Sequence, residues 1–151
     1  MFRFLVWNCR GVANKPTLSR LKILTRLHNV RLLVILEPMI RDSDIDFFRQ
    51  TLGLHGAISN PNSKIWVLWK LEYNCLPIIS HRQFLHVEIF SNDLHAYGTF
   101  VYAHCYRQNK PSLLDSLTTI AENLSTPWIV VCDFNIIRYF HENKINTTTK
   151  K

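Results

Sequence analysis

The sequence predicts a mixed α/β fold, in which mostly antiparallel sheets stack on one another with helices outside. Three short, largely apolar segments, at residues 2–7, 31–36 and 128–131, are predicted to be strands, and the continuous run at 128–131 suits a strand buried on both faces. Each of them is followed at once by polar side chains. Helical patterns and turn-separated strands fill the rest of the chain. Strands joined by hairpins, with helices outside, predict layers packed around a shared core.

Three helices are expected along the chain. The first, residues 16–28, opens with proline and threonine and then carries apolar residues at helical spacing. The second, residues 45–52, follows acidic residues that suit the positive end of a helix dipole. The third, residues 110–124, opens with Lys-Pro-Ser.

Five further strands are expected between the second and third helices. Apolar residues mark each one, and turns rich in Asn, Pro, Ser and Asp separate them. The strands are residues 55–59, 64–69, 75–80, 83–90 and 95–102. Trp66 and Trp69 are interpreted as core residues, although tryptophans at this spacing can also stack on bases.

Polar side chains stand where the three apolar strands end. Asn8 follows the first strand, and Pro38 stops the second so that Glu37 stands at its tip. Asp133 and Asn135 follow the third and, being two residues apart, point the same way. Ligands of open α/β sheets bind at the carboxyl ends of strands, which favours a metal or phosphate site here. The alternative is that Asp133 and Asn135 start an ordinary turn.

Four short motifs containing these residues occur in a family-like order. They are Trp7-Asn8-Cys9-Arg10-Gly11, Leu36-Glu37-Pro38, Val101-Tyr102-Ala103 and Cys132-Asp133-Phe134-Asn135. Together they resemble the N-terminal part of the endonuclease/exonuclease/phosphatase superfamily, and within it the apurinic-type endonuclease domain of LINE-type (non-LTR) retrotransposons. The resemblance implies a partial DNase I-like four-layer α/β sandwich. It covers residues 1–144 as a truncated domain and leaves residues 145–151 as a disordered polar tail.

The resemblance also implies a role for each matching residue. Glu37 resembles the carboxylate that binds catalytic Mg²⁺ (or Mn²⁺), and Asn8 resembles the amide that supports this metal site. Asp133 resembles the residue that orients or deprotonates the attacking water. Asn135 and Tyr102 resemble the groups that contact the scissile phosphate. These residue types suit the chemistry, because Mg²⁺ prefers oxygen ligands and metal-assisted hydrolysis needs a positioned water.

The sequence also departs from the family pattern. Full-length domains continue to a second acid and a terminal Asp-His pair, and nothing after Lys144 resembles that half. We therefore expect a catalytically incomplete chain, in which a missing half-sandwich leaves an apolar sheet face uncovered. Val131 and Cys132 stand where the family usually has two glycines, which predicts side chains that crowd the site.

The net charge of +7 is concentrated in the first quarter of the chain. Seven basic residues and no acids precede Glu37, and from there onward eleven basic residues balance eleven acids. One-sided positive charge suits the phosphate backbone of DNA. A solvated helix face is the alternative for Arg20, Lys22 and Arg26. Arg10, beside the first strand tip, and Arg107, after Tyr102, are candidate DNA contacts.

The composition excludes several further classes of protein. The four cysteines form no CxxC pair, so a zinc site is not expected. They are expected to be free thiols in a reducing compartment. No apolar stretch approaches the ~18 residues of a membrane span, so no membrane partner is expected. These features favour an intracellular location, nuclear or cytoplasmic.

The leading hypothesis is a fragment of a Mg²⁺-dependent DNA endonuclease that nicks target DNA for retrotransposition. Its parent polyprotein is expected to continue into a reverse transcriptase. Two alternatives stay open: a noncatalytic retroelement remnant with weak nucleic-acid binding, and another hydrolase of the same fold, such as a phosphatase.

Overall fold

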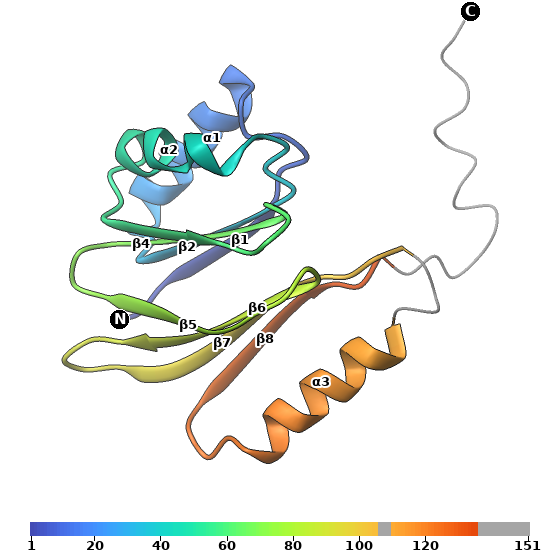
Figure 1. The fold of residues 1–151 in the computed structure, drawn as a ribbon. Helices are drawn as coiled ribbons and strands as arrows, with labels where there is room; N and C mark the ends of the chain where they lie inside the picture. Colours follow the sequence, from blue (N-terminus) through green and yellow to red (C-terminus); the bar gives the residue numbers. More distant parts are fainter. Residues whose placement is uncertain (106–109, 136–151) are drawn as a thin grey trace, which may run out of the picture.

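The computed structural model of the chain describes residues 1–105 and 110–135, and the described residues form four layers (Figure 1). Helices α1 (Lys15–Leu27) and α2 (Ile45–Thr51) lie on one sheet. A second sheet packs beneath the first, and α3 (Lys110–Glu122) covers part of its outer face. The expected α/β sandwich is therefore confirmed. Candidate nucleic-acid residue Arg107 and the expected polar tail fall outside the described residues.

The first sheet has the strand order β1-β2-β4-β3. Its strands are β1 (Phe4–Asn8), β2 (Leu32–Leu36), β3 (Gly56–Ser59) and β4 (Ile65–Trp69). β1 and β2 are parallel and place Asn8 beside Leu36, while β4 runs antiparallel to both of its neighbours. Every residue of β2 is buried, as its continuous apolar run predicts.

The second sheet has the strand order β5-β6-β7-β8. Its strands are β5 (Asn74–Ser80), β6 (Phe84–Phe90), β7 (His95–Tyr102) and β8 (Trp128–Asp133). The first three form antiparallel hairpins, and β8 returns parallel to β7 after α3. The last residue of β7, Tyr102, is therefore the register partner of the last residue of β8, Asp133.

Three apolar cores hold the four layers together. Leu21 and Trp66 belong to the core between the helices and the first sheet, and both are fully buried. Val34 and Phe100 belong to the core between the two sheets. Leu113 anchors α3 to the outer face of the second sheet. Trp66 is thus a core residue, as the sequence indicates.

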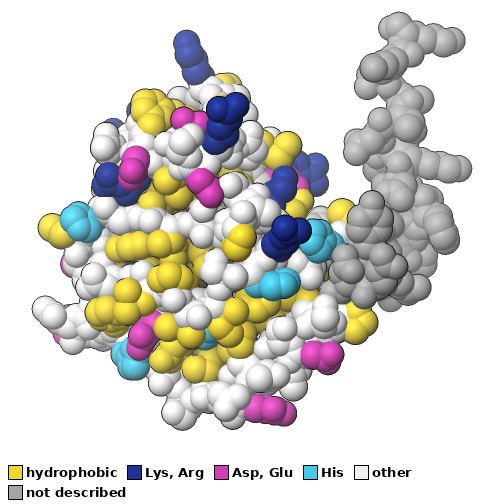
Figure 2. All heavy atoms as spheres, in the orientation of Figure 1, with side chains coloured by type: hydrophobic (Ala, Val, Ile, Leu, Met, Phe, Trp, Pro, Cys, Tyr) yellow, Lys and Arg dark blue, Asp and Glu magenta, His cyan; other side chains and the backbone are white. Residues whose placement is uncertain are grey.

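The uncovered apolar sheet face expected from a missing half-sandwich is present only in part. The chain supplies four strands to each sheet, and the two inner faces cover each other. On β5, however, Leu76, Ile78 and Ile79 are exposed, as are Leu27 and Phe47 on the helices. Figure 2 shows apolar side chains gathered over the sheets, with most of the visible Lys and Arg in the upper half, near α1 and α2.

The loop between β1 and α1 is fixed by one asparagine. Asn14 Oδ1 accepts from the backbone N of Thr17 at 2.8 Å and caps α1, while its Nδ2 donates to the carbonyl of Gly11 at 3.1 Å. Gly11 takes φ +113°, a conformation that favours glycine. This loop holds the segment that follows Asn8 in place.

All four cysteines are free thiols, as expected: Cys75 is buried, Cys9 and Cys132 are half-buried and Cys105 is exposed. Within the described residues, no helix has both the length and the apolar character needed to cross a membrane.

Candidate active site

Side chains from both sheets meet where four strands end. Asn8 closes β1, and its Nδ2 donates to Asp133 Oδ2, at the end of β8, over 2.9 Å. The Tyr102 hydroxyl, at the end of β7, donates to Glu37 Oε1, one residue beyond β2. Each bond therefore joins a residue of the first sheet to a residue of the second. Four of the sequence-predicted site residues come together in this cluster.

The backbone at these strand ends is unusual. Glu37, Arg10 and Asn135 have φ of 52°, 46° and 47°, a left-handed conformation that costs non-glycine residues free energy. For Glu37, backbone bonds on both sides hold the conformation. Its N donates to Lys64 O at 2.9 Å, and its carbonyl accepts from Gly11 N at 2.8 Å. Strained backbone of this kind concentrates at functional sites.

The turn after β8 is fixed by its own side chains. Asp133 Oδ1 accepts from the backbone N of Asn135 at 3.0 Å, so both carboxylate oxygens of Asp133 are bonded. Asn135 Nδ2 donates to Ala103 O at 2.8 Å, which ties the turn to the residue after β7. The Asn135 side chain is thus positioned beside the cluster.

Lys110 is a part of the site that sequence reasoning missed. Its Nζ donates to Phe134 O at 2.7 Å and to Asn135 O at 3.2 Å. The first residue of α3 therefore clamps the turn that presents Asp133. Only the proximity of α3 to the end of β8 reveals this contact, because lysine before proline at a helix start has no distinctive pattern.

Two buried amides, also missed from the sequence, position the same strand ends. The backbone carbonyl of Gln83 accepts from Tyr102 N at 2.8 Å, and its side-chain Oε1 accepts from His104 N at 2.8 Å. Asn60 is fully buried, and its Oδ1 accepts from the backbone N of Lys64 and Ile65, both at 2.9 Å. Its Nδ2 donates to two carbonyls in the turn before β6, so it links the two sheets.

One buried polar atom at the cluster has no protein partner. Asn8 Oδ1 is the only buried side-chain oxygen or nitrogen among the described residues that lacks a hydrogen bond. Buried polar atoms are almost always satisfied, so this carbonyl oxygen calls for a ligand. Together with the Glu37 carboxylate it supplies hard oxygen donors, the kind that Mg²⁺ and Mn²⁺ prefer. The residues present therefore fit a divalent cation.

The cluster contains only two carboxylates and otherwise amide and phenol groups. No set of three or more His, Cys, Asp or Glu side chains is close enough to hold a metal within the described part of the chain. A cation here would therefore keep several waters, as Mg²⁺ commonly does.

Arg10 lies at the edge of the cluster. Its Nε is 3.9 Å from Glu37 Oε2, and its side chain is 83% exposed while that of Glu37 is 18% exposed. Such an exposed ion pair contributes little to stability because solvent screens it. The guanidinium is therefore free to turn toward an anion in solution.

Cys9 lies beside the site, with its Sγ 3.5 Å from the carbonyl oxygen of Glu37. Burial raises the pKa of the Cys9 thiol, and the Glu37 carboxylate adds to the rise, so this thiol stays protonated near neutral pH. Val131 packs between the sheets, and Cys132 packs beneath α3. The expected crowding was therefore wrong, because alternate strand residues point into the two cores.

Comparison with known proteins agrees with this architecture. No protein-family model matches the sequence, and no curated protein matches it. Three solved structures are similar over most of this chain. An AP endonuclease from Archaeoglobus fulgidus has a TM-score of 0.66 and 12% identity, over 90% of this chain and 58% of that one. The endonuclease domain of TRAS1, a telomere-specific non-LTR retrotransposon, has a TM-score of 0.64 and 14% identity, over 91% of this chain and 62% of that one. D. rerio TDP2 complexed with single strand DNA product has a TM-score of 0.61 and 12% identity, over 90% of this chain and 61% of that one.

The class of fold follows from these findings. The chain has the DNase I-like fold, a four-layer α/β sandwich with its candidate site at the strand ends between the sheets. It is the fold of the endonuclease/exonuclease/phosphatase superfamily, which the sequence motifs resemble. The chain spans less than two thirds of the length of each of these three structures.

Proposed function

We propose that this chain is part of a metal-dependent phosphodiester hydrolase, a DNA endonuclease that nicks target DNA for retrotransposition. One observation carries the proposal: Asn8, Glu37, Tyr102 and Asp133 meet across the two sheets, beside a buried amide oxygen without a partner. The DNase I-like fold and the order of the sequence motifs support it.

Glu37 and the orphaned oxygen of Asn8 would hold Mg²⁺ or Mn²⁺. A cation bound there supplies a Lewis acid that polarises a phosphoryl oxygen. The Tyr102 hydroxyl, which donates to Glu37 Oε1, fixes the direction of that carboxylate. We propose that Tyr102 orients Glu37 and, once its hydroxyl hydrogen turns away from that carboxylate, contacts the scissile phosphate.

Asp133 would accept a proton from the attacking water. Asn8 Nδ2 and the Asn135 amide donate to its two carboxylate oxygens and keep the anion oriented. The water oxygen forms the new bond to phosphorus, the P–O3′ bond breaks, and the departing 3′ oxygen takes a proton from solvent water to become a 3′ hydroxyl. Such a 3′ hydroxyl would prime reverse transcription, for which a reverse transcriptase in the parent polyprotein is proposed. Asn135 is proposed to help hold the scissile phosphate, for which its Nδ2 would turn from Ala103 O toward a phosphate oxygen.

DNA is the proposed substrate because of where the positive charge lies. The seven basic residues before Glu37 include Arg10, which extends from the cluster into solvent. Arg107 is a proposed further contact from outside the described residues. Lys and Arg side chains gathered near α1 and α2 in Figure 2 would bind the phosphate backbone away from the cut.

We further propose that these 151 residues are insufficient for cleavage by themselves. Among the described residues, the cluster offers one candidate general base, Asp133, and two nearby cationic side chains. Arg10 is exposed, and the Lys110 ammonium already donates to the carbonyls of Phe134 and Asn135. Losing a preorganised electrostatic donor typically lowers a rate ~10²–10³-fold. We therefore propose that further groups complete the site.

The proposal separates into a metal test and an activity test. Binding of Mn²⁺, followed through the EPR signal of the free ion, should be lost in Glu37→Gln and kept in Glu122→Gln, a matched change of an exposed glutamate on α3. Unchanged Mn²⁺ binding in Glu37→Gln would refute the metal site. Nicking of supercoiled plasmid with Mg²⁺ should be negligible, and robust nicking that Glu37→Ala abolishes would overturn the proposed incompleteness.

A noncatalytic nucleic-acid-binding remnant is the second candidate, favoured by the concentration of the +7 charge in the first quarter. Weak, strongly salt-dependent DNA binding without Mn²⁺ binding at Glu37 would select it.

A further inference from the structure

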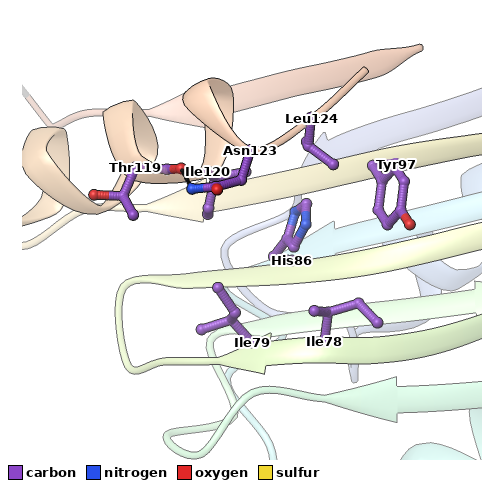
Figure 3. Close-up of a pocket in the computed structure, with 8 residues that line it drawn as sticks. All are labelled: Ile78, Ile79, His86, Tyr97, Thr119, Ile120, Asn123 and Leu124. Atoms are coloured by element: carbon purple, nitrogen blue, oxygen red, sulfur yellow. Dashed lines mark hydrogen bonds between the residues drawn. The ribbon is translucent and has the colours of Figure 1, made fainter. Parts of the chain in front are cut away.

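A cavity lies on the outer face of the second sheet, away from the candidate active site. It has a volume of about 270 Å³ and opens between β5, the middle of β6 and β7, and the C-terminal end of α3 (Figure 3). Tyr97, one of its walls, lies five residues before Tyr102 on β7, or roughly 17 Å away along the strand. The two sites are therefore separate.

A β-bulge builds one wall of the cavity. Pro77 pairs with Val87 and Ile79 pairs with His86, so Ile78 is an extra residue in β5. A bulge breaks the alternation of side chains, and here it lets the consecutive residues Ile78 and Ile79 both line the cavity. Both are exposed, at 53% and 40%, which is unusual for adjacent isoleucines. Ile120 and Leu124 of the α3 region form the opposite wall.

A hydrogen-bonded chain sets the chemistry of the cavity floor. Trp128 Nε1, which can only donate, donates to Thr99 Oγ1 at 2.8 Å. We assign the Thr99 hydroxyl as the donor to His86 Nδ1, which is also 2.8 Å away. This assignment satisfies every group in the chain and places the ring hydrogen of His86 on Nε2.

His86 therefore offers one hydrogen-bond donor inside an apolar cavity. The side chain is 3% exposed, its ring stacks on Tyr97 with an interplanar angle of 12°, and no described protein group bonds its Nε2. Burial lowers the pKa of His86, so the ring is neutral near neutral pH. Among the described residues, none that lines the cavity is Asp, Glu, Lys or Arg.

We propose that this cavity binds an uncharged heteroaromatic compound of one or two rings, whose ring nitrogen or carbonyl oxygen accepts a hydrogen bond from His86 Nε2. The volume suits such a ring system, since an apolar cavity of ~150 Å³ already admits benzene. A charged ligand would find no counter-charge here, and an aliphatic one would leave the Nε2 donor unpaired. This inference is independent of the proposed nuclease function.

The test compares two probes of the same shape on the full chain. Isoquinoline has a ring nitrogen that accepts a hydrogen bond, and naphthalene does not. Ligand-observed saturation-transfer NMR near neutral pH does not depend on the oligomeric state of the protein. Isoquinoline should bind roughly two- to tenfold more tightly than naphthalene, the range expected for one neutral hydrogen bond. Equal affinities would overturn the proposal.

Two pairs of variants locate the binding. Ile79→Trp should fill the cavity and abolish the isoquinoline signal, while Leu76→Trp, on the same strand face but outside the cavity, should retain it. Retained binding in Ile79→Trp would place the probe elsewhere and refute the site. His86→Phe keeps the ring and removes the donor, so it should bind the two probes equally. If His86→Phe does not fold, the Ile79 and Leu76 variants still decide the outcome.

Discussion

Asn8 and Asp133 are 125 residues apart in the sequence, yet the Asn8 amide donates to the Asp133 carboxylate over 2.9 Å. The bond joins the last residue of β1 in one sheet to the last residue of β8 in the other. It uses only the nitrogen of the amide and leaves the buried oxygen free. One asparagine thus both joins the two sheets and presents a buried oxygen donor at the cluster.

Asn8→Asp should make the protein depend on a divalent cation for stability. The change replaces a donor with a second carboxylate next to Asp133, so the free energy of unfolding should fall by ~1–3 kcal/mol in a chelator. Mn²⁺ should restore part of it, because a cation offsets the repulsion. Thermal unfolding with chelator and with Mn²⁺ measures this, with the exposed Asn92→Asp as control. Equal destabilisation under both conditions would contradict a cation site at this position.

Lys110→Met should loosen the turn that carries Asp133. The methionine keeps the length of the side chain but leaves the carbonyls of Phe134 and Asn135 without their donor, at a cost of ~1–3 kcal/mol. Chemical denaturation should show the loss, and hydrogen exchange of the Asn135 amide should quicken because its bond to Asp133 weakens. Lys22→Met, on α1, serves as the control. Unchanged exchange at Asn135 would show that Lys110 does not clamp the turn.

Asn60→Ala should be among the most destabilising single changes in the chain. Asn60 is 0% exposed and its side chain bonds backbone groups of both sheets. Several buried backbone groups would lose their partners at once, so a loss of about 3 kcal/mol or more is expected. Urea unfolding of Asn60→Ala beside the exposed Asn92→Ala tests this. A difference below about 1 kcal/mol between the two would rule out the linking role.

Alkaline pH should destabilise the native state through Cys75. Burial raises the pKa of this thiol to about 12, from an ordinary value of 9.0. Because the pKa of Cys75 is higher in the folded state than in the unfolded state, this contribution to stability is fully present at pH values below about 9. It is lost as the pH rises from about 9 toward about 12. The unfolding free energy should therefore fall by up to ~1.4 kcal/mol per pH unit in that window. Denaturation of Cys75→Val should show a shallower decline than the wild type, whereas Cys105→Ala, at an exposed cysteine, should match it. Parallel declines in Cys75→Val and wild type would exclude this origin.

The helices, the strands and the polar residues at the strand ends could be predicted from the sequence, because each depends on local pattern. The apolar run of β2 and the proline after Glu37 are examples. Which sheet each strand joins could not be predicted, since pairing depends on contacts distant in the sequence.

The contacts that hold the site were also beyond sequence reasoning. Lys110, Gln83 and Asn60 act through backbone carbonyls and amides that only the fold brings near them. Any surface lysine or turn asparagine has the same local sequence pattern. The extra residue Ile78 in β5 is likewise visible only once its pairing with β6 is known.

The bonds between the sheets also set the order in which the site can assemble. The Tyr102–Glu37 and Asn8–Asp133 contacts close loops of 65 and 125 residues, so both rank among the slow, non-local steps of folding. On the ribosome, all four strands of the first sheet emerge before any strand of the second. Glu37 and Asn8 are therefore synthesised well before their partners, and a nascent chain that ends before Asp133 cannot form the cluster.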